Sequence, residues 1–171
     1  YYDSAYVYFS KGKAFALSEG NPQLLTDALA LRGKYLTRMG FIAEGEAALD
    51  SAIAMQDQVG KQYKEVILAR CERAYLQAFK GDFQSMLSQY QTINLDARKL
   101  PPVMDSVRAM VLHQVGNAYS IFGEWDSAIH YANQTLEIRH RILPPNHLTI
   151  AYSENSLGVA YSYLEEYEES L

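Results

Sequence analysis

The chain of 171 residues carries 15 Lys and Arg against 20 Asp and Glu, a formal net charge of −5, and 49% of its residues are hydrophobic. This acidity argues against nucleic acid as a partner of this segment, because nucleic-acid binding depends on a clustered basic surface. A basic or neutral partner fits better. The single cysteine, Cys71, excludes an intrachain disulfide and fits a reducing, cytoplasmic compartment. The sequence has no apolar run long enough to span a membrane, so we expect no membrane contact by this segment.

Apolar residues recur at steps of three and four along the chain, which predicts amphipathic helices and no strands. In chain order, we expect helices over residues 3–18, 22–39, 42–59, 63–80 and from 83 onward, then a hairpin within 107–138 and a last helical segment that begins after Asn146. Glycines are expected to end helices and make the turns, since glycine adopts a positive φ without strain. They are Gly20, Gly40, Gly60, Gly81 and Gly123.

Individual residues indicate where helices begin and cross. Asn21 and Asn146 stand directly before expected helices, so both are predicted N-caps. Gly116 and Gly158 are expected to let two antiparallel helices pack closely, because they lack a side chain. Neither belongs to a phosphate-binding loop pattern.

The hairpin within 107–138 combines Gly116, an aromatic residue at Tyr119 and a turn at Gly123. The pattern returns as LGVAYSYLEEYEESL at 157–171. It resembles the tetratricopeptide repeat (TPR), in which a small residue permits helix crossing, an aromatic follows three residues later and a glycine makes the turn.

The repeat is longer than the usual form of this family. Gly40, Gly81, Gly123 and Glu165 recur about every 42 residues, whereas the usual repeat has about 34. This length, together with the segment EIRHRILPPNHLTIA, resembles the kinesin light chain subtype. By this comparison, a turn is expected at Glu165.

The resemblance implies an all-α fold, a right-handed α-α superhelix of TPR-type helical hairpins. Residues 1–171 would form one array fragment. Because each hairpin leaves apolar surface on both sides, an incomplete last repeat would favour self-association. The array would consist of a half repeat at 1–20, full repeats at 21–60, 61–100 and 101–143, and a truncated repeat at 144–171.

The sequence favours no catalytic or metal site. It lacks the CxxC, HxxxH and HExxH spacings of metal sites and the glycine-rich loops of nucleotide sites. We therefore expect no enzyme activity, metal or cofactor, with Cys71 and His113 as inner-surface or packed residues. The cluster Arg139-His140-Arg141 is expected at a helix C-terminus, where the helix dipole favours cations.

What remains as a candidate site is the concave groove. The resemblance implies that residues of the first helix of each hairpin line it, with a basic end, an aromatic stretch and an amide-containing stretch. This mixture suits an extended peptide whose backbone is held by the asparagines; the alternative at each position is an ordinary surface residue without a ligand. The candidate groove residues are Lys34, Arg38, Tyr75, Phe79, His113, Asn117, Tyr152 and Asn155.

Two functions follow from this interpretation. The first is a non-catalytic scaffold that binds a peptide or protein segment in the groove. The alternative is a sensory or regulatory module of a larger bacterial signalling protein, a histidine kinase or transcriptional regulator. The repeated Asp-Ser-Ala segments and long connections resemble the repeat regions of such proteins. The sensory function would also allow a periplasmic location.

Overall fold

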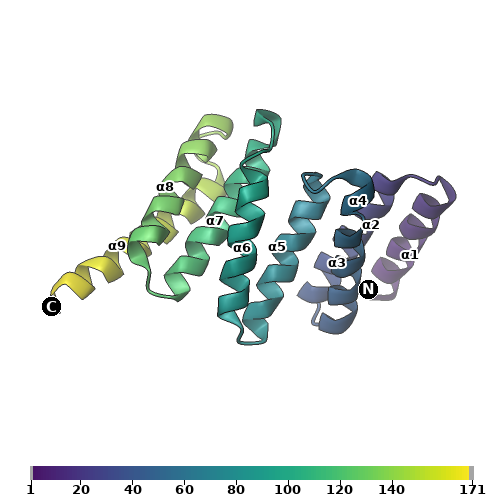
Figure 1. The fold of residues 1–171 in the computed structure, drawn as a ribbon, viewed down its shortest axis with the longest axis horizontal. Coiled ribbons are helices and arrows are strands. Elements are labelled where there is room, and N and C mark those ends of the chain that lie inside the picture. The colour runs from purple at the N-terminus through teal and green to yellow at the C-terminus, as the bar shows by residue number, and fades with distance from the viewer. Residues whose placement is uncertain (1, 170–171) are drawn as a thin grey trace. The chain divides into compact units, whose positions relative to one another are not determined.

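The computed structural model describes the backbone of residues 2–169 and the side chains of residues 7–165. All regular elements of this range are helices, which confirms the all-α class (Figure 1). Their bounds are α1 Tyr2–Ser18, α2 Pro22–Arg38, α3 Ile42–Ala54, α4 Gln56–Val59, α5 Lys64–Phe79, α6 Phe83–Ala97, a 3₁₀ turn η1 at Pro102–Met104, α7 Asp105–Ile121, α8 Trp125–Ile142 and α9 Leu148–Glu169.

The chain divides into two compact units, Tyr1–Leu76 and Gln77–Leu171, and the boundary falls within α5. In the first unit, buried side chains of α2, α3 and α5 form one apolar core cluster. In the second unit, α7 packs against α8, and α6 and α9 also pack against this pair. The core cluster of the first unit contains Leu29, Ala30, Leu49, Ala52, Ala69 and Leu76.

Two glycines allow α2 and α3 to cross closely. A Cβ on Gly33 of α2 would lie 2.6 Å from Cγ of Leu49, and a Cβ on Gly45 of α3 would lie 2.8 Å from the backbone nitrogen of Thr37. Real Cβ atoms do not come this close, so neither position has room for a side chain. The crossing sets the direction of α2, which carries candidate site residues.

The α7–α8 hairpin is built around Gly116, as expected. A Cβ there would lie 3.3 Å from Cβ of Tyr131 and 3.4 Å from the carbonyl oxygen of Ala128. The ring of Tyr131 stacks on that of Tyr119 with centroids 5.5 Å apart. The expectation for Gly158 is not met within the part of the chain that the structure describes, because none of its atoms lies within 4 Å of a Cβ placed there.

The predicted turn glycines are confirmed. Gly20, Gly40, Gly60, Gly81 and Gly123 all have positive φ, between 58° and 94°. In this conformation an L side chain is strained.

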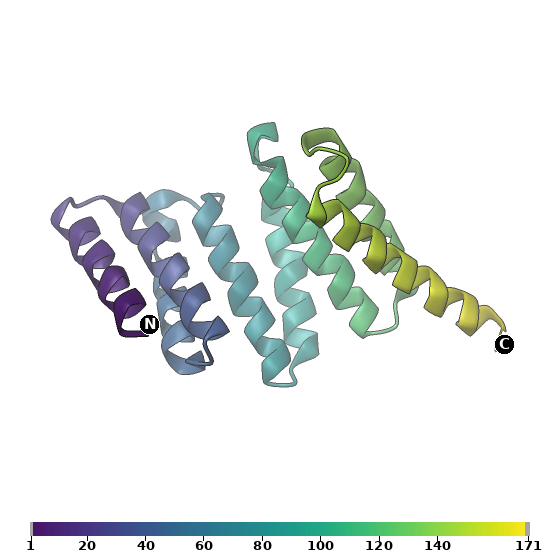
Figure 2. The ribbon, with the colours of Figure 1, turned by 180° about the vertical axis from the view of Figure 1, so that it is seen from behind.

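The predicted turn at Glu165 is wrong, because α9 continues without interruption from Leu148 to Glu169. Glu165 occupies the register position of Gly123, but a glutamate disfavours the positive φ of that turn and favours helix. The last turns of α9 consequently run on past the turn between α7 and α8 (Figures 1 and 2).

The helix ends show one confirmed cap and two further differences. Asn21 caps α2 by accepting a hydrogen bond from the backbone nitrogen of Leu24 at 3.1 Å. Asn146 does not take the predicted role: His147 precedes α9, and its Nδ1 accepts from the backbone nitrogen of Thr149 at 3.3 Å. The helix expected to run to Gly60 is broken after Ala54, and the short α4 follows.

Candidate functional site

The candidate site residues lie on first helices of the hairpins, which here are α2 and α5 in the first unit and α7 and α9 in the second. We call the exposed residues of α2 and α5 the first-helix face of the first unit, and those of α7 and α9 the first-helix face of the second. In the first unit, Lys34 and Arg38 of α2 approach the same carboxylate oxygen of Glu72 on α5, at 3.6 and 3.8 Å. The predicted basic end is therefore partly neutralised by a residue that the sequence analysis did not identify.

A cavity of about 220 Å³ lies between α2 and α5 in the first unit. Each helix contributes four residues at positions i, i+3, i+4 and i+7, a spacing that places them on one side of a helix. Of the lining residues, only Lys34 was predicted from the sequence, although the matching spacing in two first helices is a signal that could have identified the others. The lining residues are Asp27, Ala30, Leu31 and Lys34 of α2, and Glu65, Leu68, Ala69 and Glu72 of α5.

A tyrosine holds one carboxylate of this cavity in place. The hydroxyl of Tyr63 donates a hydrogen bond to Oδ1 of Asp27 at 2.9 Å. Burial and the negative charge of Asp27 raise the pKa of Tyr63 to about 12. The hydroxyl therefore stays protonated and remains a donor at neutral pH.

Two exposed aromatic side chains follow on α5. The exposed fraction is 49% for Tyr75 and 66% for Phe79. Exposed large aromatic side chains are characteristic of interaction surfaces, where they supply buried area at low entropic cost. Tyr75 belongs to the first unit, on the turn of α5 that follows Glu72, and Phe79 belongs to the second.

In the second unit, the structure brings His113 and Asn117 together on α7. Nδ2 of Asn117 lies 3.3 Å from Nε2 of His113, within hydrogen-bond distance. Burial, together with the nearby charge of Arg139, lowers the pKa of His113 to about 4. The imidazole is therefore neutral at physiological pH and presents a polar, uncharged surface beside the Asn117 amide.

Tyr152 and Asn155 lie on α9 with exposed side chains. They share one side of the helix, three residues apart. Their accessibility is compatible with the predicted contact to a ligand, which stays a prediction.

Of the two alternatives for Cys71, inner-surface or packed, the structure shows the packed one, because its side chain is buried. Burial raises the pKa of the Cys71 thiol to about 12. Since the thiolate is the reactive form of cysteine, this residue is poorly suited to act as a nucleophile or metal ligand.

The basic cluster near the end of α8 makes internal contacts. Arg139 is buried and donates to the carbonyl oxygen of Thr149 at 2.5 Å and to the hydroxyl of Ser153. Arg141 donates to Oδ2 of Asp105 at 2.5 Å. The cluster thus connects α8 to α9 and to the start of α7.

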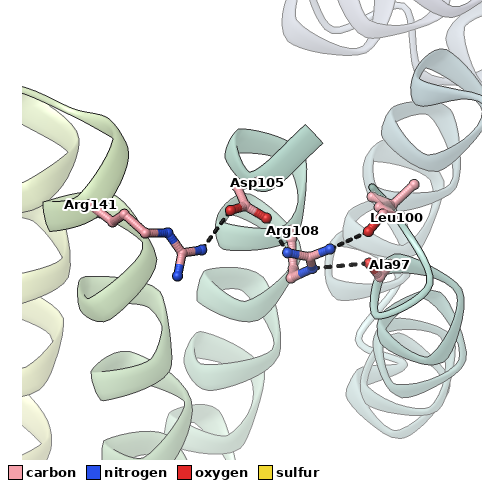
Figure 3. Close-up of polar contacts among 5 residues, drawn as sticks. All are labelled: Ala97, Leu100, Asp105, Arg108 and Arg141. Carbon is pink, nitrogen blue, oxygen red and sulfur yellow. Dashed lines mark hydrogen bonds and ion pairs between the residues drawn. The ribbon is translucent and has the colours of Figure 1, made fainter. Parts of the chain in front are cut away.

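Asp105 lies between two guanidinium groups at the start of α7 (Figure 3). Its other oxygen pairs with Arg108, which also donates to the carbonyl oxygens of Ala97, the last residue of α6, and of Leu100 in the following loop. The network therefore joins the end of α6, the start of α7 and the end of α8, which holds α7 and its residues His113 and Asn117 in place.

Among the residues that the structure describes, no three His, Cys, Asp or Glu side chains gather closely enough to hold a metal ion. Within the same part of the chain, none of the helices is long and apolar enough to cross a membrane.

Comparison with known proteins agrees with this geometry. Residues 107–171 match the model of the tetratricopeptide repeat family. No curated protein is significantly similar in sequence.

Solved structures share the fold over most of the chain. BtubC (BKLC) from P. vanneervenii has a TM-score of 0.74 at 16% identity, over 86% of this chain and 59% of that one. This chain thus spans less than two thirds of BtubC. A Podosopora anserina putative kinesin light chain with nearly identical TPR-like repeats scores 0.65 at 17% identity, over 94% and 78% of the two chains. A singly substituted form of those repeats scores 0.71 at 19% identity, over 86% and 70%. At these identities the similarity establishes the fold.

Proposed function

Since residues 107–171 belong to the tetratricopeptide repeat family and the chain shares the fold of kinesin-light-chain-like repeats, we propose that this protein is a non-catalytic scaffold that binds a peptide or protein segment. The bound segment contacts the first-helix face of one unit. The family fold is typical of protein-interaction scaffolds, and the proposal adds where the ligand lies.

The observation that supports this proposal best is the combination of a cavity and an exposed aromatic side chain on one face. The cavity between α2 and α5 lies beside Glu72, and Tyr75 is exposed on the next turn of the same helix. Extended peptides bind through side-chain pockets and backbone hydrogen bonds. The first-helix face of the first unit offers a pocket and an aromatic side chain, and that of the second unit offers the amides of Asn117 and Asn155.

The test is a selection of random 12-residue displayed peptides on the purified chain, followed by affinity measurements on substituted proteins. We expect Tyr75→Ala to weaken peptides that bind the first unit, and Asn117→Ala to weaken peptides that bind the second, each at least about fivefold, as the loss of an interface anchor does. The melting temperature should change little, because both side chains are at least partly exposed.

Leu95→Ala is the matched control, because Leu95 is an exposed apolar residue on the second helix α6. It should leave peptide affinity unchanged. Loss of binding in Leu95→Ala but not in Tyr75→Ala would mean that the peptide binds the second helices, and would contradict a site on the first helices. Failure to select any peptide would contradict peptide binding itself.

The sensory-module alternative concerns what this chain is joined to in a larger protein. It stays a prediction of the sequence analysis.

A further inference from the structure

We propose that the cavity between α2 and α5 holds the side chain of a lysine or arginine of the bound segment, with its cationic head beside Asp27 and Glu65. This inference rests on the proposed function and names the kind of side chain that the first unit selects.

The size of the cavity favours one long side chain. Its volume of about 220 Å³ is below the range of about 300–1,000 Å³ typical of sites that enclose drug-sized ligands. A single residue of a peptide fits that space, with the peptide backbone outside.

The middle of the cavity is apolar and suits a methylene chain. Ala30 and Ala69 are both buried and form a floor without long side chains, and Leu31 and Leu68 lie beside them. Leu31 is 59% exposed in this structure. Lysine and arginine bury their aliphatic stems along such surfaces while the charged head stays near water, so an inserted stem would cover Leu31.

Charge decides which kind of long side chain fits. The lining carries three carboxylates and one ammonium, a formal charge of −2. The Glu65 side chain is mostly sheltered, with 25% of its surface exposed. Its ion-pair partner is the ammonium of Lys64, at 3.6 Å. The Lys64 side chain is 53% exposed and does not line the cavity. Exposed pairs of this kind contribute little, so a ligand cation can replace Lys64 as the partner of Glu65.

The two ends of the cavity differ, which gives the ligand a direction. Asp27 and Glu65 are the first of the four lining residues on their helices, and the hydrogen bond that Asp27 accepts comes from the neutral Tyr63 hydroxyl. At the other end, Lys34 and Arg38 already share Glu72. A ligand cation is attracted to the first end and repelled from the second.

Other side chains fit less well. An acidic side chain would place its carboxylate beside Asp27 and Glu65. An uncharged apolar side chain would remove water from these carboxylates without offering them a partner, and such desolvation is unfavourable.

The test is nuclear magnetic resonance of the ¹⁵N-labelled chain titrated with the N-acetyl methylamides of lysine, arginine and norleucine. Norleucine has the lysine stem without the ammonium. We expect lysine and arginine to cause saturable shifts in the amides of Asp27, Leu31, Glu65 and Leu68, and norleucine to bind at least about fivefold more weakly.

Variants localise the effect. Glu65→Gln and Asp27→Asn keep the size of the side chain and should each weaken lysine binding about threefold or more, while Glu44→Gln should not. Glu44 is an exposed acidic residue of α3 in the same unit and lies outside the cavity. Its substitution changes the net charge of the protein by the same amount.

Three results would overturn the inference: equal affinity for norleucine and lysine, shifts that persist unchanged in Glu65→Gln, or no saturable shift at the cavity. The peptide selection separates this failure from failure of the proposed function. Selected peptides that depend on Tyr75 but share no basic residue would leave the scaffold function standing and contradict the lysine or arginine site.

Discussion

Gly33 of α2 and Leu49 of α3 are in such close contact that the two helices can cross only because Gly33 lacks a side chain. A Cβ on Gly33 would lie 2.6 Å from Cγ of Leu49 and 3.0 Å from its backbone nitrogen. Leu49 is fully buried, so it has no free space to move into. Lys34 directly follows Gly33 in α2, so this contact also places a residue of the cavity.

Gly33→Ala should therefore lower the free energy of unfolding by about 1–3 kcal/mol, the usual cost of overpacking. Gly158→Ala is the matched substitution in a helix with open space, since no atom lies within 4 Å of a Cβ there. It should raise stability by about 0.5–1 kcal/mol, the difference in helix propensity. Thermal and urea unfolding measure both; equal effects of the two substitutions would contradict the crossing.

Arg73 of α5 pairs with two carboxylates of α3. Its Nη2 lies 2.6 Å from Oε1 of Glu46, and its Nε lies 2.9 Å from Oδ1 of Asp50. The Glu46 side chain is 20% exposed and that of Asp50 is 55% exposed. The two carboxylates should therefore differ in how much they stabilise the link between α3 and α5.

Glu46→Gln should cost about 1–2 kcal/mol, because the charge of a sheltered ion-pair partner is lost. Asp50→Asn should cost less than about 0.5 kcal/mol, as is usual for an exposed pair. Urea unfolding of the two variants measures the difference, and a larger loss for Asp50→Asn would contradict this assignment.

Removal of the Asp105 carboxylate should destabilise the second unit. Asp105→Ala leaves Arg108, whose side chain is largely buried, without its ion-pair partner, and we expect a loss of about 2–4 kcal/mol. Arg141→Gln should cost less, because Arg141 is mostly exposed and water can solvate what remains. In Asp105→Ala, the rate of amide hydrogen exchange should increase more in α7 than in α2. An equal increase in both helices would contradict a local role of Asp105.

His113 should make stability depend on pH. The pKa of His113 is lowered from 6.5 to about 4 in the folded protein, so between these values the unfolded chain binds more protons. The free energy of unfolding therefore decreases as the pH falls from 6.5 towards 4. In His113→Gln, the free energy of unfolding should differ less between pH 7 and pH 5 than in the unsubstituted protein, as measured by urea unfolding at both pH values. His130→Gln, which replaces an exposed histidine of α8, is the control. An unchanged pH dependence in His113→Gln would contradict the effect of burial.

The sequence predicted the helices well, because their boundaries depend on local signals. Gly40, Gly81 and Gly123 have the positive φ that the pattern requires, and Asn21 caps α2. The prediction failed where a residue type departed from the repeat. Glu165 stands at the register position of a turn glycine, and repeat spacing alone suggested a turn that glutamate does not favour.

The candidate site was predicted less completely, because its chemistry depends on pairs from different helices. Lys34 and Arg38 were expected to form a basic end, but Glu72 of α5 approaches both. The carboxylates of Asp27 and Glu65 contribute to one cavity only because α2 and α5 lie alongside each other in the first unit. The spacing of residues along one helix does not show which residues of another helix will lie beside them.

The most direct test of the scaffold function is to locate the bound peptide. Backbone amide shifts of the ¹⁵N-labelled chain should be recorded with and without a selected peptide. We predict the largest changes in exposed or partly exposed residues of the first helices of one unit, which include Lys34 and Tyr75 in the first unit and Asn117 and Asn155 in the second. Changes confined to α3, α6 and α8 would contradict the account, because the ligand would then lie on the second helices.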